Sequence, residues 1–218
     1  MCSPSSAPAP SQRSSETAST SPATNDDQAA FISFVLDDVQ TSFGKQVRGY
    51  ETARLTLFRG SINSACGTAT SAVGPFYCPI DKKAYIDLAF YDQLRSQFGA
   101  PGDFAQAYVI AHEIGHHLQN LRGLLGKGEV DSIATELQAD CFAGAWAKDA
   151  EARKLLDVGD IDEALNAAAQ IGDDTLQKKG QGYVQPEKWT HGSAAQRSSA
   201  FKRGYTSGLT ACEQVAAN

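Results

Sequence analysis

Residues 112–116 form a His-Glu-x-x-His motif, directly after the apolar run at residues 107–111. His112 and His116 are four residues apart, so on a helix both imidazoles project from one face and can bind the same metal ion. The apolar run indicates a buried helix, where unpaired histidine and glutamate side chains would cost free energy. A bound metal would satisfy such a cluster. The alternative is a helix with purely structural histidines.

Zinc suits this pair of ligands, because it is commonly bound by neutral imidazole nitrogen at about 2.0–2.1 Å. Glu113 follows the first histidine directly and would lie over the open coordination position, where it could accept a proton from bound water. The ion would lower the pKa of that water from 15.7 toward about 7 and polarise the scissile carbonyl. The motif therefore predicts a zinc-dependent peptidase with Glu113 as general base.

A catalytic zinc also needs a third protein ligand and one open position. His117 is disfavoured, because it is rotated about 100° from His116 on a helix, and it is expected as a neighbour that supports the ligands; His191 is a more distant alternative. Glu136 and Asp140 lie on one face of the next predicted helix. If that helix lay antiparallel beside the first, Glu136 would bind zinc and Asp140 would accept a hydrogen bond from a ligand histidine. The alternative is a solvated helix face.

Helical patterns dominate the rest of the chain, with a few strand patterns near its start. Strands are predicted over residues 50–58 and 84–90, on either side of an irregular, Gly- and Ser-rich loop at residues 60–82. Helices are predicted over residues 91–98, 103–121, 130–149, 161–171 and 193–209, after a first helix that begins at residues 25–27. That first helix is expected to bury these residues: Phe31, Phe34, Val35, Leu36 and Val39. The pattern predicts one predominantly helical α+β domain over residues 26–218, with a small antiparallel or mixed sheet.

The N-terminal segment differs in composition from the rest of the chain. Residues 1–25 are rich in Ser, Thr, Pro and Ala, with little to bury, so we expect a disordered tether. A cysteine at its start, Cys2, resembles the lipid-modified cysteine of processed bacterial lipoproteins. The alternative is that Cys2 is incidental.

Four further cysteines, Cys66, Cys78, Cys141 and Cys212, contain no Cys-x-x-Cys pair, and three pairings into two disulfides are possible. The close spacing of Cys66 and Cys78 favours a disulfide between them, which leaves Cys141 to pair with Cys212. Two disulfides would place the protein outside the cytoplasm, in the cell envelope or secreted. The alternative is four free thiols in a cytosolic protein.

Charge and hydropathy exclude several classes of function. The net charge is −6 and no run of Lys or Arg occurs, so binding to nucleic acid or to an anionic membrane surface is not supported. The longest apolar stretches, residues 31–36 and 105–111, are far shorter than the roughly 20 residues that cross a bilayer.

Four segments together, at residues 66–79, 109–117, 136–141 and 190–197, resemble the bacterial neutral zinc metallopeptidase family. The resemblance runs in consistent order over roughly residues 45–212. It implies a zincin-like fold of the gluzincin type, with an HExxH helix, a following helix that carries Glu-x-x-x-Asp, and a small sheet whose edge meets the substrate.

The last of these segments, Thr-His-Gly-Ser followed by Arg197, is also similar to a Thr-His-Pro segment of the HtpX and CAAX-protease-type metallopeptidases. That similarity implies that His191 donates a hydrogen bond to the developing oxyanion and that Arg197 orders the site. This chain has Gly192 where those relatives carry proline, and it lacks their membrane helices. A capping or supporting role for His191 is the alternative.

The sequence leaves the substrate-binding strand and the type of activity open. An extended peptide or protein substrate would pair with an edge strand, for which residues 85–88 or 55–58 are candidates, although either could be an interior strand. Besides a peptidase, the chain could be a cell-envelope lipoprotein that binds or scaffolds partners without turnover, or a hydrolase of non-peptide amides. The intact Glu113 argues against the scaffold, because a site without turnover needs no base.

Overall fold

The computed structural model describes residues 25–96, 100, 102–125, 133–213 and 215. Their elements, in chain order, are α1 (Asn25–Gln46), β1 (Arg54–Phe58), β2 (Ser61–Ser64), β3 (Gly67–Thr70), β4 (Phe76–Cys78), β5 (Lys83–Asp87), α2 (Leu88–Ser96), α3 (Asp103–Leu121), α4 (Ile133–Ala152), α5 (Asp160–Gln170), α6 (Asp173–Gln181), a short 3-10 helix (Pro186–Lys188), α7 (Ala194–Ser207) and α8 (Leu209–Cys212). The predicted predominantly helical α+β fold is confirmed. The predictions for residues 1–24 and for the loop at 126–131 lie outside the described residues.

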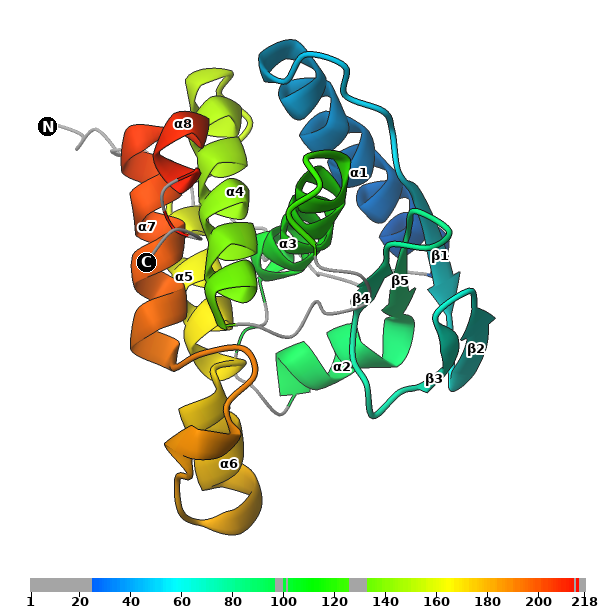
Figure 1. The fold of residues 1–218 in the computed structure, drawn as a ribbon, viewed down its shortest axis with the longest axis vertical. Helices are drawn as coiled ribbons and strands as arrows, with labels where there is room; N and C mark the ends of the chain where they lie inside the picture. Colours follow the sequence, from blue (N-terminus) through cyan, green and yellow to red (C-terminus); the bar gives the residue numbers. More distant parts are fainter. Residues whose placement is uncertain (1–24, 97–99, 101, 126–132, 214, 216–218) are drawn as a thin grey trace, which may run out of the picture.

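The helix α3 lies at the centre of the molecule, between α1 and the sheet on one side and α4, α5 and α7 on the other (Figure 1). It packs against α1, α4 and α5, and also against β4 and β5. Every residue from 104 to 119 is buried, as expected for a helix that is covered all round. The polar side chains of its motif are therefore held inside the protein and need partners there.

The helices α4 and α7 pack at very short range because each carries a glycine at the crossing. A Cβ atom on Gly144 would clash with the carbonyl oxygen of Phe201, and one on Gly204 would clash with that of Cys141. The close contact fixes α4 and α7 relative to each other.

A three-stranded mixed sheet packs beside α3 in the strand order β1-β5-β4. β1 and β5 are parallel, with Leu57 opposite Ile86, and β4 is antiparallel to β5, with Tyr77 opposite Ala84. Of the two segments considered as a substrate edge, residues 85–87 therefore lie in the interior strand, Leu88 begins α2, and residues 55–58 lie on an edge. The second edge is β4, which the sequence did not suggest.

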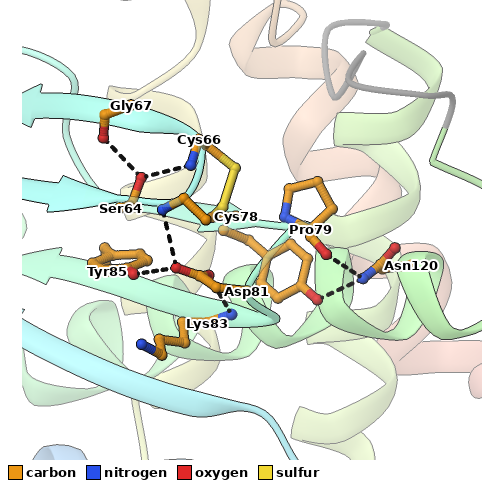
Figure 2. The surroundings of a disulfide bond; sticks show 11 residues. Ser64, Cys66, Gly67, Cys78, Pro79, Asp81, Lys83, Tyr85 and Asn120 are labelled. Carbon is orange, nitrogen blue, oxygen red and sulfur yellow. Dashed lines mark hydrogen bonds between the residues drawn. A yellow bond between two sulfur atoms is a disulfide. The ribbon is translucent and has the colours of Figure 1, made fainter.

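The prediction of one irregular loop over residues 60–82 was wrong in part. β2 and β3 form an antiparallel hairpin with Ile62 opposite Ala69, and β4 follows. β2 and β3 are four residues long and rich in Ser, Thr and Gly, so they show no clear alternation of apolar residues. β4 has only three residues, too few to show a pattern. The predicted cross-link is present: Cys66, at the hairpin turn, is bonded to Cys78 at the end of β4 (Figure 2).

A second disulfide joins Cys141 in α4 to Cys212 in α8. The two bonds are the pairing that the cysteine spacing favoured, and they indicate an oxidising, extracytoplasmic compartment. Among the described residues, no helix combines the length and the apolar character needed to cross a bilayer. A lipid anchor at Cys2 stays a prediction.

The apolar face of α1 differs from the one expected. The buried apolar residues of α1 are Ile32, Val35, Val39 and Phe43, whereas Phe34 is 58% exposed. Phe34 precedes Val35 directly and is therefore rotated about 100° away from the buried face. Helical spacing, and not hydrophobicity alone, decides which residues are buried.

Several element boundaries also differ. β1 begins at Arg54 and not at residue 50, and α2 takes over the last three residues of the strand predicted over 84–90. α6 was not predicted, because its sequence has a single large apolar residue, Leu176, and no helical period. It extends beyond the other helices at the bottom of Figure 1.

Candidate active site

Three predicted metal ligands from two helices converge at the centre of the molecule. His112 and His116 of α3 and Glu136 of α4 are all buried, and their ligand atoms lie within 4.8 Å of one another. The two Nε2 atoms are 3.1 Å apart, and the Glu136 oxygens lie 3.2 Å from Nε2 of His112 and 3.3 Å from Nε2 of His116. The structure thus brings together the donor set that the sequence proposed.

Gly115, inside the motif, allows the helix that carries Glu136 to approach. A Cβ atom at this position would lie 3.0 Å from the carbonyl oxygen of Ala139 and 3.1 Å from its Cα atom, closer than ordinary van der Waals contact. Ala139 directly precedes Asp140 and follows Glu136 by three residues on α4, so the contact at Gly115 sets the distance of both carboxylates from α3.

The ring of His112 is oriented by a buried polar cluster. Its Nδ1 atom lies 2.8 Å from Asp140 Oδ1, and the same oxygen accepts a hydrogen bond of 2.5 Å from the Tyr108 hydroxyl. Arg197 donates from Nε to Asp140 Oδ2 at 2.8 Å and from Nη2 to Oδ1 at 3.0 Å. Because a carboxylate only accepts, His112 carries a proton on Nδ1, and Nε2, which faces Glu136, is the ring nitrogen left to bind a metal.

The ring of His116 is held by a residue that sequence reasoning missed. Its Nδ1 atom lies 2.8 Å from Oε1 of Gln119. Gln119 follows His116 by three residues on α3, so the two side chains share a face. That spacing was the signal that could have identified Gln119 from the sequence.

The carboxylates make this cluster attractive to a cation. Burial lowers the pKa of His112, but Asp140 and Glu136 outweigh burial and raise it to about 10. Burial likewise opposes ionisation of Asp140, but Arg197 and His112 lower the pKa of its carboxyl to about 2. The histidines hold the pKa of Glu136 well below its usual range in spite of its burial. Both carboxylates therefore stay ionised inside the protein.

Glu113 is buried beside these groups, and one of its oxygens is not satisfied. Burial raises the pKa of its carboxyl, an effect that His112 and His116 partly oppose. Among the described residues, its Oε2 atom has no hydrogen-bond partner. A buried acceptor without a partner is costly, which is the mark of a group arranged for a ligand or a reaction.

His117 lies outside the donor set. Its Nδ1 atom is 2.9 Å from the Tyr77 hydroxyl and its Nε2 atom is 2.7 Å from the carbonyl oxygen of Glu51. Asn120, one turn along α3, donates to the same hydroxyl and to the carbonyl of Pro79 (Figure 2). His117 and Asn120 thus fasten the edge strand β4 to the motif helix.

A cleft of about 560 Å³ opens onto the cluster. One wall is formed by the β2–β3 hairpin and by β4, including Phe76 and Tyr77, and the opposite wall includes Ile171, Leu176 and His191. At its base lie the following polar side chains: His112, Glu113, His116, Glu136 and Arg197. The Cys66–Cys78 disulfide ties the hairpin to β4, so both parts of the first wall are fixed to each other (Figure 2).

The segment that carries His191 is held by Asp173, a second residue that the sequence did not reveal. Asp173 Oδ2 accepts hydrogen bonds from three consecutive backbone N–H groups, those of Thr190, His191 and Gly192, at 2.8, 2.7 and 3.0 Å. Its Oδ1 atom lies 3.3 Å from Nδ1 of His191. No pattern in the sequence links residues that lie in separate elements in this way.

Gly192 occupies the position where the similar membrane metallopeptidases carry proline. Its φ angle is +90° and its N–H donates to Asp173. Proline has φ near −65° and no N–H, so it could make neither feature. The segment therefore follows a path that depends on glycine.

The donor distances fit a tetrahedral zinc site. A tetrahedron's edge is about 1.63 times its centre-to-corner distance, so ligands at about 2.0–2.1 Å from zinc lie about 3.3–3.4 Å apart. The two Nε2 atoms are 3.1 Å apart, and each lies close to one oxygen of Glu136: His112 is 3.2 Å from Oε2 and His116 is 3.3 Å from Oε1. Two oriented imidazoles and one carboxylate are also a ligand set typical of catalytic zinc, and the unpartnered Glu113 oxygen faces no competing protein donor among the described residues.

The fold and this donor set define a helical α+β protein with a candidate zinc centre on an HExxH helix. The chain belongs to the family described as "Putative neutral zinc metallopeptidase", whose model matches residues 2–215. This agrees with the resemblance drawn from the motifs.

Two curated relatives illustrate the extent of the family. The chain is 46% identical to "Uncharacterized protein YpfJ" of Escherichia coli (strain K12), over 91% of this chain and 75% of the relative. It is 47% identical to "Uncharacterized protein Rv2575" of Mycobacterium tuberculosis, over 73% of this chain and 61% of the relative. No solved structure matches the chain significantly.

Proposed function

We propose that this protein is a zinc-dependent peptidase in which His112, His116 and Glu136 bind the metal. The observation that carries the proposal is the buried triangle of donor atoms, with an unpartnered Glu113 oxygen beside it, at the base of an open cleft. Zinc in such a site lowers the pKa of a water ligand from 15.7 to about 7 and polarises the carbonyl of the bond to be cleaved.

Glu113 acts as the general base. Its buried carboxylate accepts the proton of the attacking water and passes it to the leaving amine. The Asp140 carboxylate and the Gln119 amide keep the two histidine rings oriented, since they accept hydrogen bonds from the Nδ1 atoms. Arg197 keeps Asp140 ionised and in place.

His191 donates a hydrogen bond to the oxyanion that forms on the cleaved carbonyl. Support comes from its position in the wall of the same cleft and from Asp173, which fixes its backbone. The Thr190 hydroxyl lies 2.9 Å from Nδ1 of His191 and can donate to that nitrogen. The ring then carries its proton on Nε2, the edge that would meet the substrate.

The substrate is a peptide or protein in extended conformation. The cleft volume of about 560 Å³ is ample for several residues, since ligand pockets usually span about 300–1,000 Å³. The edge strand β4, which contributes Phe76 and Tyr77 to the cleft, offers backbone groups for pairing with such a chain.

The test compares three variants with the wild type for bound zinc and for cleavage of casein and a peptide library. Glu113→Gln is expected to retain one zinc per chain and to lose about 10²–10⁴-fold in kcat, whereas His112→Ala is expected to lose the metal. Glu187→Gln, at an exposed glutamate outside the cleft, is the matched control and should behave as wild type.

Other results would assign a different function to the chain. Zinc without cleavage of any peptide would support the binding or scaffold function, and cleavage restricted to non-peptide amides would assign the same chemistry to another substrate class. Activity of Glu113→Gln equal to that of the wild type would refute the proposed base.

A further inference from the structure

A chain of hydrogen bonds leads from the His116 ring to the C-terminal helix. Gln119 Oε1 lies 2.8 Å from His116 Nδ1, and Gln119 Nε2 donates to Gln138 Oε1 at 3.0 Å and to the Thr135 carbonyl at 2.7 Å. Gln138 Nε2 in turn donates to the Cys212 carbonyl at 3.0 Å. Both glutamine side chains are fully buried, with 0% and 1% of their surface exposed, so no water competes for these bonds.

The two backbone carbonyls determine the direction of every bond in this chain. The Cys212 carbonyl can only accept, so the Gln138 amide must turn its nitrogen toward it and its oxygen toward Gln119. The Thr135 carbonyl and the Gln138 side-chain oxygen are both acceptors, so both bind the Gln119 nitrogen. The Gln119 oxygen is then left to accept from His116. His116 must then donate from Nδ1, so Nε2 is the nitrogen left to bind the metal.

We propose that Gln119 and Gln138 are positioning residues that set the tautomer and the orientation of His116, with the α8 backbone as their fixed end. His112 receives its tautomer from an ionised carboxylate, whereas His116 receives the same tautomer from two neutral amides, and a neutral amide is held in one orientation only by its other hydrogen bonds. The inference rests on the ligand role of His116 in the proposed function, not on peptide cleavage.

The Cys212 backbone, at the end of this hydrogen-bond chain, is held in place by burial and by a disulfide. Cys212 is fully buried and is covalently joined to Cys141, which lies one turn beyond Gln138 on α4. The helix with the histidine ligands, the helix with Glu136 and the C-terminal helix are therefore joined by one buried polar path. Through this path, the Cys141–Cys212 disulfide is connected to the His116 ring.

The experiment replaces each amide with a side chain of similar shape that cannot form the chain. Gln119→Met is expected to weaken zinc binding by about 10–100-fold, measured by competition with a chelator, and Gln138→Met by on the order of 10-fold or less. Gln106→Met is the matched control, because Gln106 is also a buried glutamine of α3 but its hydrogen bond is to Gln28. The control should bind zinc within about twofold of the wild type.

A second readout separates positioning from general loss of structure. In the metal-free wild type, ¹⁵N NMR should show His116 with a proton on Nδ1 that is protected from exchange, and this signal should be lost or mixed in Gln119→Met and Gln138→Met but kept in Gln106→Met. Wild-type protein without a protected Nδ1 proton, or Gln119→Met with wild-type zinc affinity, would overturn the inference. Since the NMR readout needs neither zinc nor substrate, failure of the peptidase proposal would be distinguishable.

Discussion

Replacing Arg197 by methionine tests the electrostatic design of the site most directly. Arg197 is 2% exposed and Asp140 is 0% exposed, and two guanidinium nitrogens contact both carboxylate oxygens. Without the arginine, Asp140 would keep only the hydrogen bonds of Tyr108 and His112 for a fully buried charge. Leaving one charge of a buried pair without its partner costs about 3–5 kcal/mol, a large fraction of the roughly 5–15 kcal/mol by which a domain is stable.

The assay is urea unfolding at pH 7 of protein treated with a chelator, so that no metal contributes. Arg153→Met is the matched control, because Arg153 also contacts both oxygens of an aspartate, Asp38, but its side chain is 30% exposed. Solvent screening should limit the control's loss to about 1 kcal/mol.

A double variant isolates the charge itself. Because Asp140→Asn removes the unpaired charge, Arg197→Met combined with Asp140→Asn should be more stable than the sum of the two single effects by on the order of 1–3 kcal/mol. If Arg197→Met cost no more than Arg153→Met, or if the two effects simply added, the assigned role of the buried pair would be refuted.

Three further predictions concern packing, pH and the His191 segment. Gly115→Ala forces α4 away from α3; chelator competition should show weaker zinc binding by about 10-fold, and unchanged affinity would contradict the tight contact. Burial raises the pKa of Asp38, but hydrogen bonds from Arg153 and Trp146 outweigh burial and lower the pKa. Urea unfolding of Asp38→Asn should therefore show a constant loss of stability above about pH 5. The loss should vanish below about pH 4, where acid protonates the wild-type carboxyl as well. If the loss of stability in Asp38→Asn grew in acid, the pKa of Asp38 would be raised by folding and not lowered. Asp173→Asn should lower peptide turnover by up to about 100-fold at wild-type zinc content, and full turnover would exclude a role in holding His191.

The three metal ligands could be predicted from the sequence because their arrangement depends on local helix geometry. Two histidines four residues apart on a helix must share a face, and the same periodicity pairs Glu136 with Asp140. The apolar run before the motif also indicated burial correctly, since α3 is covered on all sides. The error at Phe34 in α1 shows the limit of this reasoning, because several apolar residues competed there for one face.

Helical periodicity is a property of the backbone, so the order of residues was enough to predict that two imidazoles face one point and that a carboxylate on the next helix completes them. The strand that borders the cleft, the hold of Asp173 on His191 and the orientation of His116 by Gln119 and Gln138 became visible only in the folded protein. These are contacts between elements far apart in the chain, and they depend on how closely the helices pack. At Gly115 that distance is set by the absence of a single Cβ atom.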